Sequence, residues 1–306
     1  MVVKKITGLM AVVLVLFFSG CSYWFFLNSH YETVFDKQMH YIDVGDKDKP
    51  VVMVLHGNPI SSYGYRDVIP YLQADNRVIA LDMFNHGLSD KGYPMDLASH
   101  QLAVNQFIEQ MGFEDVTLLL HDWGFPVGMS YVMQHPENVK AIAFMEVFLA
   151  YDHESELPLG MQNVRNNVTE EQFLAGNLFI EQVLFNSIPE LTEADREVYR
   201  HPFRDMENRR QTWLWPNAIP VRETSSQHVA YFEQIEDFMK NSDIPKLLMY
   251  AEPGVFVTPQ KRDYMIAEFN NLSVEYVGEG KHWLQESHSD EVGMAVRSWL
   301  DQVVDQ

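Results

Sequence analysis

Cysteine is almost absent from this 306-residue chain, which contains a single one at position 21. An intrachain disulfide is therefore excluded. Metal-binding motifs are missing as well, because there is no HExxH sequence and the 12 histidines show no ligand spacing. We therefore expect no metal site.

Basic residues are scarce too, with 22 Lys and Arg against 43 Asp and Glu and a formal net charge of −21. A nucleic-acid-binding surface needs clustered Lys and Arg, so nucleic acid is not expected as a partner. No internal repeat or low-complexity tract is visible, which argues against a solenoid or a disordered protein. At 46% hydrophobic residues, the chain can bury the core of one large domain or of a domain with an insertion.

The N-terminus carries a long apolar run. Two lysines precede Ile6–Phe18, and small residues then lead to Cys21, where a bacterial lipoprotein signal has its lipidated residue. Phe18 departs from that pattern, which more often has leucine three positions before the cysteine. The sequence predicts a lipoprotein-type signal over residues 1–21 and a linker over residues 22–34.

An uncleaved membrane anchor is the competing interpretation of this segment. The letters "SYWFFL" extend the apolar run to about 22 residues, which is enough to span a bilayer. A plain core helix is disfavoured, because lysines precede the run and no amphipathic face is present. Both favoured interpretations tether the chain to a membrane and place the rest of it on the periplasmic or outer side.

Short apolar runs alternate with helical patterns along the remaining chain, which is typical of a mostly parallel sheet covered on both faces. The rhythm is interrupted between Glu146 and Lys246, where helical patterns but no strand are visible, so we expect an inserted helical cap. The predicted strands are Met39–Val44, Val51–His56, Arg77–Asp82, Val116–His121, Ala141–Glu146, Lys246–Ala251 and Leu272–Val277. The predicted helices are Gln101–Met111, Phe125–His135, Gln227–Met239, Pro259–Phe269 and Asp290–Val304.

The stretch "LLLHDWGFPVG" reads as a strand, a tight turn and a helix, with Asp122 in the turn. This outline is that of a nucleophile elbow, with a carboxylate where hydrolases usually expose a serine. A helix N-cap is the alternative role, because Asp is a favoured N-cap residue. Upstream, "LHGNP" follows a buried strand and predicts an oxyanion-hole loop, in which Asn58 adds an amide able to donate to an anion.

A histidine and a carboxylate complete the candidate set. "VGEGKHWL" brings His282 to the end of the last predicted strand, where such folds place the catalytic base, and His288 is the rival. Glu146 and Glu252 each end a strand, and either could orient the imidazole.

These motifs are similar to those of the haloalkane dehalogenase family. "HGNPISSYGYRDVIPYL" and "HDWG" resemble its oxyanion loop and nucleophile elbow, while "FMEV", "NLFIEQVL", "WPNAIP", "AEPGV" and "GKHWLQE" resemble later segments. The resemblance runs from about Val34 to the C-terminus and implies an α/β-hydrolase fold with an eight-stranded, mostly parallel sheet. It implies a core of residues 35–147 and 240–306 and a cap of residues 148–239.

The resemblance also implies residue roles: Asp122 as nucleophile, His282 as base and Glu146 as acid, with Glu252 as the rival carboxylate. Asn58 and Trp123 would bind halide with their side chains and form the oxyanion hole with their backbone N–H groups. The reaction would convert a haloalkane and water into an alcohol, halide and a proton, without a cofactor, in a monomeric catalytic domain. Residues expected to line the substrate pocket are Phe125, Phe148, Phe179, Trp215, Pro216 and Phe256.

Two features depart from the family pattern: the leader, and the pair Phe125-Pro126 after the elbow glycine, where a phenylalanine is expected to reshape the pocket floor. Three other functions remain open. Epoxide hydrolases share an Asp elbow but typically carry an aromatic residue at the position of Asn58, and a luciferase-like oxygenase would show the same triad. A non-catalytic surface lipoprotein is the alternative of a different class.

Overall fold

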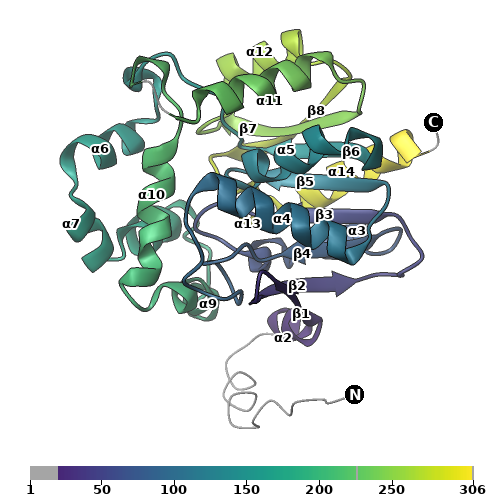
Figure 1. Ribbon diagram of the computed structural model, residues 1–306, viewed down its shortest axis with the longest axis horizontal. Helices are drawn as coiled ribbons and strands as arrows, with labels where there is room; N and C mark the ends of the chain where they lie inside the picture. The colour runs from purple at the N-terminus through teal and green to yellow at the C-terminus, as the bar shows by residue number, and fades with distance from the viewer. Residues whose placement is uncertain (1–19, 225–226, 305–306) are drawn as a thin grey trace.

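Eight strands form one sheet in this computed structural model, which describes residues 20–224 and 227–304 (Figure 1). The strand order is β1-β2-β4-β3-β5-β6-β7-β8, with β1 and β2 antiparallel to their neighbours and the other pairs parallel. The strands are β1 (Ser29–Val34), β2 (Lys37–Val44), β3 (Val51–Leu55), β4 (Arg77–Leu81), β5 (Val116–His121), β6 (Val139–Met145), β7 (Lys246–Pro253) and β8 (Leu272–Gly280). The predicted α/β-hydrolase fold is confirmed, and each predicted strand overlaps an observed one.

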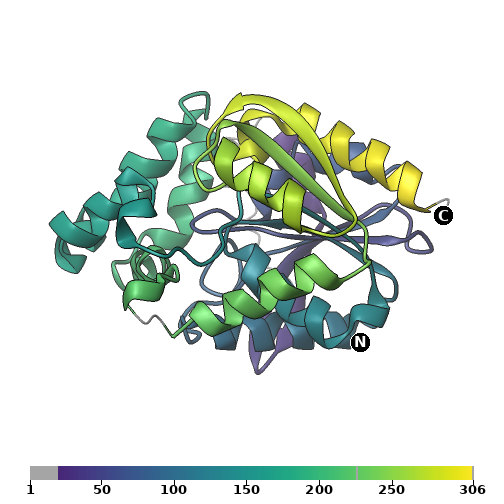
Figure 2. The same cartoon turned by 90° about the horizontal axis from the view of Figure 1, so that it is seen from above.

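Two layers of helices cover the sheet, because the central strands are apolar on both faces. One face packs against α4, α5 and α11, and the opposite face packs against α3, α13 and α14 (Figure 2). These helices are α3 (Ile69–Leu72), α4 (Leu97–Met111), α5 (Gly124–Gln134), α11 (Val229–Asn241), α13 (Leu284–Ser287) and α14 (Ser289–Val304), and α12 (Pro259–Glu268) lies between β7 and β8 in the chain.

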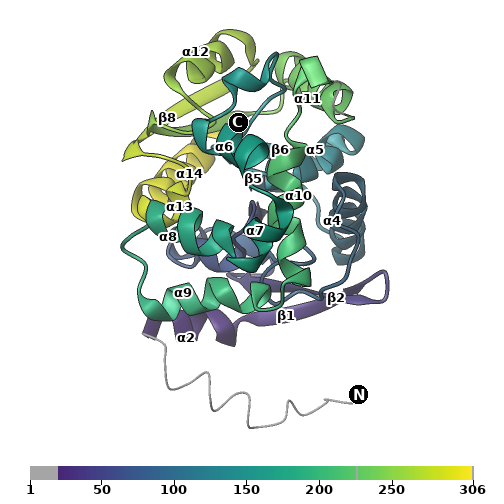
Figure 3. The same cartoon turned by 90° about the vertical axis from the view of Figure 1, so that its left-hand side faces the viewer.

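The cap lies between β6 and β7 in sequence, and its helices form the left-hand side of the molecule in Figure 1 and face the viewer in Figure 3. We predicted that the cap ends at residue 239. This boundary is wrong, because it places most of α11 in the cap. That helix buries Phe232, Ile235 and Met239 in the same core as α5, so it belongs to the layer that covers the sheet. The cap helices are α6 (Leu159–Asn167), α7 (Glu170–Ala175), a π-helix (Phe179–Leu184), α8 (Phe185–Ser187), α9 (Glu193–Arg200) and α10 (Arg210–Ala218).

The linker predicted over residues 22–34 is also wrong. Residues Gly20–Leu27 form helix α2, whose Phe25 is buried, and the next residues form the edge strand β1. A two-residue turn joins β1 to β2, with Phe35 and Asp36 both at positive φ, as a type I′ hairpin requires. The hairpin escapes sequence reasoning because neither turn residue is glycine or asparagine.

Residues 1–19, which carry most of the predicted signal, lie outside the described residues. Cys21 falls within α2, but its side chain also lies outside the description. Among the helices of residues 20–224 and 227–304, none is long and apolar enough to cross a membrane.

Candidate active site

Asp122 occupies a sharp turn between β5 and α5. Its φ of 50° is unusual for a residue with a side chain, and such strain gathers at functional turns. Only glycine fits beside it, because a Cβ at Gly57 would lie 2.3 Å from the Cβ of Asp122, and one at Gly124 would lie 2.3 Å from the carbonyl oxygen of Leu55. The loops after β3 and β5 therefore approach closely enough to share one site.

The Asp122 carboxylate is buried and held by the backbone of the neighbouring loop. Asn58 N–H donates to its Oδ1 at 2.8 Å, whereas no side chain caps α5, so the N-cap alternative does not apply. Burial raises the pKa of Asp122, and the nearby His282 and the N–H groups of Asn58 and Trp123 oppose that rise. The carboxylate therefore faces the loop after β3 and does not cap its own helix.

His282, which follows β8, lies between two carboxylates. Its Nδ1 is 3.1 Å from Oε2 of Glu146, and its Nε2 is 3.7 Å from Oδ2 of Asp122. With the Nδ1 proton donated to Glu146, Nε2 carries the lone pair that faces Asp122. The 3.7 Å gap is longer than a hydrogen bond, so the imidazole does not hold the Asp122 carboxylate in place.

Glu146 is fully buried at the end of β6 and accepts hydrogen bonds from the loop after β7. The N–H groups of Val255, Phe256 and Val257 donate to its two oxygens at 3.0 to 3.3 Å. These N–H groups fix the carboxylate beside His282, so Glu146 can stabilise an imidazolium that forms there. The structure thus brings Asp122, Glu146 and His282 together.

The two rival residues lie apart from this cluster. Glu252 is exposed and hydrogen bonds to Arg262. His288 packs near Gly278 and Gly280, and its Nδ1 lies 2.8 Å from the hydroxyl of Ser287.

Asn58 carries an unsatisfied donor beside Asp122. Its side chain is 2% exposed, and its Nδ2 is buried with no hydrogen-bond partner in the described part of the chain. A buried amide donor without a partner costs about 1–3 kcal/mol, so such a group needs an explanation. An anion placed next to Asp122 would supply the missing acceptor.

Two buried histidines that the sequence reasoning missed support these groups. His86 Nε2 lies 3.3 Å from Asn58 Oδ1, and its Nδ1 lies 3.1 Å from the carbonyl oxygen of Phe84. Burial lowers the pKa of His86 well below its usual value, so the ring is neutral and has one N–H. Both neighbours are acceptors, so the single N–H of the neutral ring can donate to only one of them, and donation from Nε2 to the Asn58 oxygen would leave Nδ2 facing the site. His121 Nε2 donates to the carbonyl oxygen of His282 at 3.0 Å.

Aromatic rings enclose the Asp122 side of the site. The Trp123 ring lies 5.0 Å from that of Trp215 and 5.2 Å from that of Phe148, and the Phe256 ring lies 5.2 Å from that of His282. Trp215 is fixed by its Nε1–H, which donates to the carbonyl oxygen of Met95 at 2.8 Å. These rings form apolar walls beside the buried side chains of Asp122 and His282.

The other predicted pocket residues have different neighbours. Phe125 packs on Phe144 of β6, at a ring distance of 5.6 Å, within the core between α5 and the sheet. Phe179 lies against Phe173 in the cap, at 6.0 Å, and Pro216 is buried inside α10. We expected Phe125 to shape the pocket floor. This expectation is wrong, because its ring contacts the sheet.

Within the described residues, no group of His, Cys, Asp and Glu side chains could hold a metal ion. The titratable groups that converge at this site are Asp122, Glu146 and His282, which suit nucleophilic and general-base chemistry.

Comparison with known proteins first gives the class. Residues 50–289 match the family model described as the alpha/beta hydrolase fold. A haloalkane dehalogenase of Sphingobium indicum is 34% identical over 276 residues, covering 86% of this chain and 92% of that protein. One from Mesorhizobium japonicum is 30% identical over 280 residues, covering 89% and 90%. The chain belongs to the haloalkane dehalogenase family.

Solved structures agree with this assignment. The crystal structure of an ancestral haloalkane dehalogenase superposes with a TM-score of 0.86 at 30% identity, covering 90% of this chain and 100% of that one. The haloalkane dehalogenase from Bradyrhizobium elkani gives a TM-score of 0.86 at 28% identity, covering 90% and 98%.

Proposed function

We propose that this protein hydrolyses haloalkanes to an alcohol, a halide ion and a proton. The single observation that carries the proposal is the unpartnered, buried Nδ2 of Asn58 beside the buried carboxylate of Asp122. A nucleophile next to an N–H donor that lacks an acceptor suits a reaction in which an anion departs from the attacked carbon. The family relatives named haloalkane dehalogenase support the same chemistry.

In the first step an Asp122 oxygen attacks the carbon that bears the halogen. A carbon–oxygen bond forms, the halide leaves with the bonding pair, and an alkyl ester of Asp122 remains. Asn58 Nδ2–H and the indole N–H of Trp123 would donate to the departing halide. Donors aimed at developing charge in a water-poor site are typically worth about 3–4 kcal/mol each.

In the second step His282 removes a proton from water through Nε2, and the resulting hydroxide attacks the ester carbonyl of Asp122. The N–H groups of Asn58 and Trp123 would stabilise the oxyanion, and Glu146 would stabilise the imidazolium. Collapse releases the alcohol and restores the carboxylate, and His282 then gives its proton to solvent. We therefore propose that the protein belongs to the subgroup with an Asp-His-Glu triad and an Asn-Trp halide pair.

Halide release from 1-bromohexane and 1,2-dibromoethane tests the proposal directly. Wild-type protein is expected to release bromide, and Asp122→Asn to lose about a thousand-fold or more of that activity, because the nucleophile is gone. Glu252→Gln is the matched control, since this exposed carboxylate is bonded to Arg262 and should leave the rate unchanged. Absence of bromide release across a panel of bromo- and iodoalkanes would exclude the function.

A stalled intermediate distinguishes this chemistry from the alternatives. His282→Phe is expected to accumulate a covalent adduct whose mass exceeds that of the protein by the alkyl group, because the ester forms but is not hydrolysed. An epoxide hydrolase would show that adduct with epoxides and none with bromoalkanes. A luciferase-like oxygenase would consume oxygen, and a non-catalytic lipoprotein would form no adduct.

Tethering to a membrane through Cys21 is part of the proposal. A basic start, an apolar run and small residues before that cysteine favour a lipidated signal over an uncleaved anchor. Labelling of cells with radioactive palmitate should mark the wild type and leave Cys21→Ala unmarked. Equal labelling of both would exclude lipidation at this residue.

A further inference from the structure

His121 is a fully buried histidine that the proposed reaction does not use, and it ends β5 directly before the nucleophile Asp122. Its ring centre lies 4.6 Å from that of His282, although the two residues are 161 positions apart in the chain. The side chain therefore connects the strand that positions the nucleophile with the segment that carries the base.

Both ring nitrogens of His121 have a partner in the segment after β8. Nε2 lies 3.0 Å from the carbonyl oxygen of His282, and Nδ1 lies 3.3 Å from Nε2 of Gln285 in α13. Burial lowers the pKa of His121 well below its usual value, so the ring is neutral and has one N–H. The carbonyl oxygen can only accept, so this proton is on Nε2, and the lone pair of Nδ1 accepts from the Gln285 amide. One neutral tautomer thus satisfies both contacts.

The segment that carries the base makes a tight turn. Leu284 N–H donates to the carbonyl oxygen of His282 at 3.1 Å, and Trp283 between them has φ −91° and ψ 68°. These values are close to those of an inverse γ-turn. His121 donates to the same carbonyl oxygen that closes the turn, and Gln285 follows directly after it. The His121 ring is therefore bonded at both ends of the turn.

Gln285 provides its donor at a cost in stability. The residue is 1% exposed, and its Oε1 has no hydrogen-bond partner in the described residues. A buried amide oxygen without a partner is unfavourable, whereas an apolar side chain of the same length would avoid that cost. Turning the amide around would not help, because its oxygen would then face the lone pair of His121 Nδ1. The N–H donated to His121 is thus the contribution that explains a glutamine at this position.

We infer that His121 and Gln285 are positioning residues, which hold the imidazole of His282 in place for hydrolysis of the Asp122 ester. The inference rests on the proposed function, in which His282 acts only in this second step. Glu146 orients the imidazole through Nδ1, whereas His121 and Gln285 fix the turn from which the imidazole extends. Both supports matter, because a misplacement of about 1 Å can cost on the order of 100-fold in rate. A neutral His121 also adds no positive charge beside the imidazolium that forms on His282.

Rapid-quench kinetics of the full chain with 1-bromohexane separate the two steps, because bromide reports ester formation and 1-hexanol reports ester hydrolysis. For His121→Leu we expect ester formation within about 2-fold of the wild-type rate, since the attack by Asp122 does not involve the His282 ring. Ester hydrolysis should slow by about 10- to 100-fold, so that the alkyl ester accumulates and is visible by mass. His121→Gln should recover most of that rate, because its amide N–H can donate to the same carbonyl oxygen.

Gln285→Met separates the positioning role from a contribution to stability. This variant keeps the length of the side chain and removes the buried oxygen that lacks a partner, so the free energy of unfolding in urea should not fall. Ester hydrolysis should nevertheless slow by roughly 2- to 10-fold, the worth of one hydrogen bond. A residue that acts through packing alone would lose stability and would leave the ratio of the two rates unchanged.

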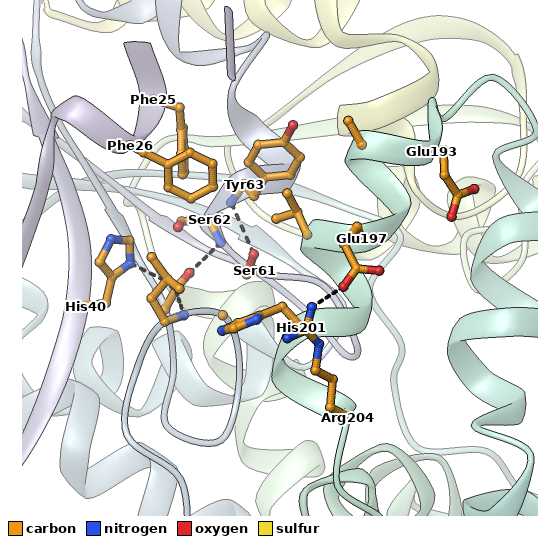
Figure 4. Close-up of a pocket in the computed structure, with 15 residues that line it drawn as sticks. Phe25, Phe26, His40, Ser61, Ser62, Tyr63, Glu193, Glu197, His201 and Arg204 are labelled. Carbon is orange, nitrogen blue, oxygen red and sulfur yellow. Dashed lines mark hydrogen bonds and ion pairs between the residues drawn. The ribbon is translucent and has the colours of Figure 1, made fainter. Parts of the chain in front are cut away.

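His40→Leu is the matched control for His121→Leu. His40 is also fully buried and also has a partner at each ring nitrogen, Asp82 at 2.7 Å and the Ser29 hydroxyl at 2.9 Å. It lines a cavity of about 420 Å³ beside α2 and α9, and none of the proposed catalytic residues lines that cavity (Figure 4). This variant should lower the free energy of unfolding and leave the ratio of the two rates unchanged.

NMR spectra of protein with isotope-labelled histidine test the contact without turnover, because they distinguish the ring tautomers. We expect the proton of His121 on Nε2 and a proton of His282 on Nδ1, where it is bonded to Glu146. The Nδ1–H signal of His282 should broaden or vanish in His121→Leu and return in His121→Gln. A loss of that signal links His121 to the orientation of the imidazole.

The inference is overturned if His121→Leu slows both steps equally or neither step, if His121→Gln fails to recover ester hydrolysis, or if the His121 ring carries its proton on Nδ1. Should His121→Leu not fold, Gln285→Met and the wild-type spectrum decide the question. A wild type that releases no bromide rejects the proposed function, and the tautomer of His121 then still tests the contact. Normal wild-type turnover with unchanged ester hydrolysis in His121→Leu and Gln285→Met rejects the positioning role alone.

Discussion

Burial disfavours the charged form of Asp122, so this carboxylate lowers the stability of the fold at neutral pH. Because the pKa of Asp122 is raised, the folded protein binds the carboxyl proton more tightly than the unfolded chain does. The contribution of Asp122 to stability therefore becomes less favourable as the pH rises from its pKa in the unfolded chain through its pKa in the folded protein. We therefore expect Asp122→Asn to raise the free energy of unfolding at pH 7, and this gain to vanish near about pH 3, where both states are protonated.

Urea unfolding of both proteins at the two pH values measures this difference. Asp301→Asn is the control, because Asp301 is exposed at the end of α14 and its removal should change neither value. A gain for Asp122→Asn that is the same at both pH values would contradict the assignment of its cause to the buried charge.

His86 contacts the oxygen of the Asn58 amide, so under the proposed function it should influence halide binding without touching the halide. In His86→Leu the amide loses its 3.3 Å partner, and iodide affinity should fall by roughly 2- to 10-fold, the worth of one hydrogen bond. Quenching of tryptophan fluorescence by iodide measures the affinity. His100→Leu is the control, because His100 also packs on Trp215, at 4.9 Å, but is not bonded to Asn58. Equal losses in both variants would indicate a packing effect.

At the scale of elements, apolar runs predict the central sheet because their pattern depends on burial alone. The strands Val51–Leu55 and Val116–His121 are buried along their whole length, and the sequence shows this as runs in which apolar letters predominate. The edge strand Ser29–Val34 is mostly exposed on both faces, so its letters carry no such signal. Its position depends on pairing with β2, which is a tertiary contact.

A substitution in the turn between β1 and β2 should stabilise the protein. Phe35 has a φ of 49° and is 50% exposed, so Phe35→Asn should relieve backbone strain without loss of core packing. We expect the free energy of unfolding to rise by about 0.5–1 kcal/mol, as measured by thermal or urea unfolding. Phe35→Leu is the control that shortens the side chain without easing the positive φ. An equal gain in both variants would assign the effect to the lost aromatic surface.

Across the whole molecule, the sequence predicts those site residues that directly follow a strand of the sheet, because the end of the strand determines their position. Asp122, His282 and Asn58 each follow a strand of the parallel sheet, and such ends meet at one edge. The choice between Glu146 and Glu252 was not predictable, because it depends on where β6 and β7 stop. Strand β6 ends at Met145, whereas β7 continues to Pro253 and carries Glu252 to the surface.

A buried ion pair of the core, to which the cap is hydrogen-bonded, gives a prediction for the whole fold. Arg66 Nη1 and Nη2 donate to Glu286 at 2.6 and 3.0 Å, and Tyr199 of α9 also bonds to Glu286. Burial raises the pKa of Glu286, and Arg66 opposes that rise. Arg66→Met leaves the carboxylate buried without its partner, which should cost about 3–5 kcal/mol of stability at neutral pH.

The sign of the pH dependence follows from the same charge. Without Arg66 the pKa of Glu286 rises further in the folded protein, so the stability lost in Arg66→Met should grow as the pH rises from acid to neutral and shrink as Glu286 becomes protonated. Unfolding curves at pH 5 and pH 8 measure this change. The double variant Arg66→Met with Glu286→Gln should recover most of the loss, because the buried charge of Glu286 is then removed as well. A loss that does not depend on pH, or no recovery in the double variant, would show that Arg66 stabilises the cap through packing on Tyr63, whose ring it covers at 4.4 Å.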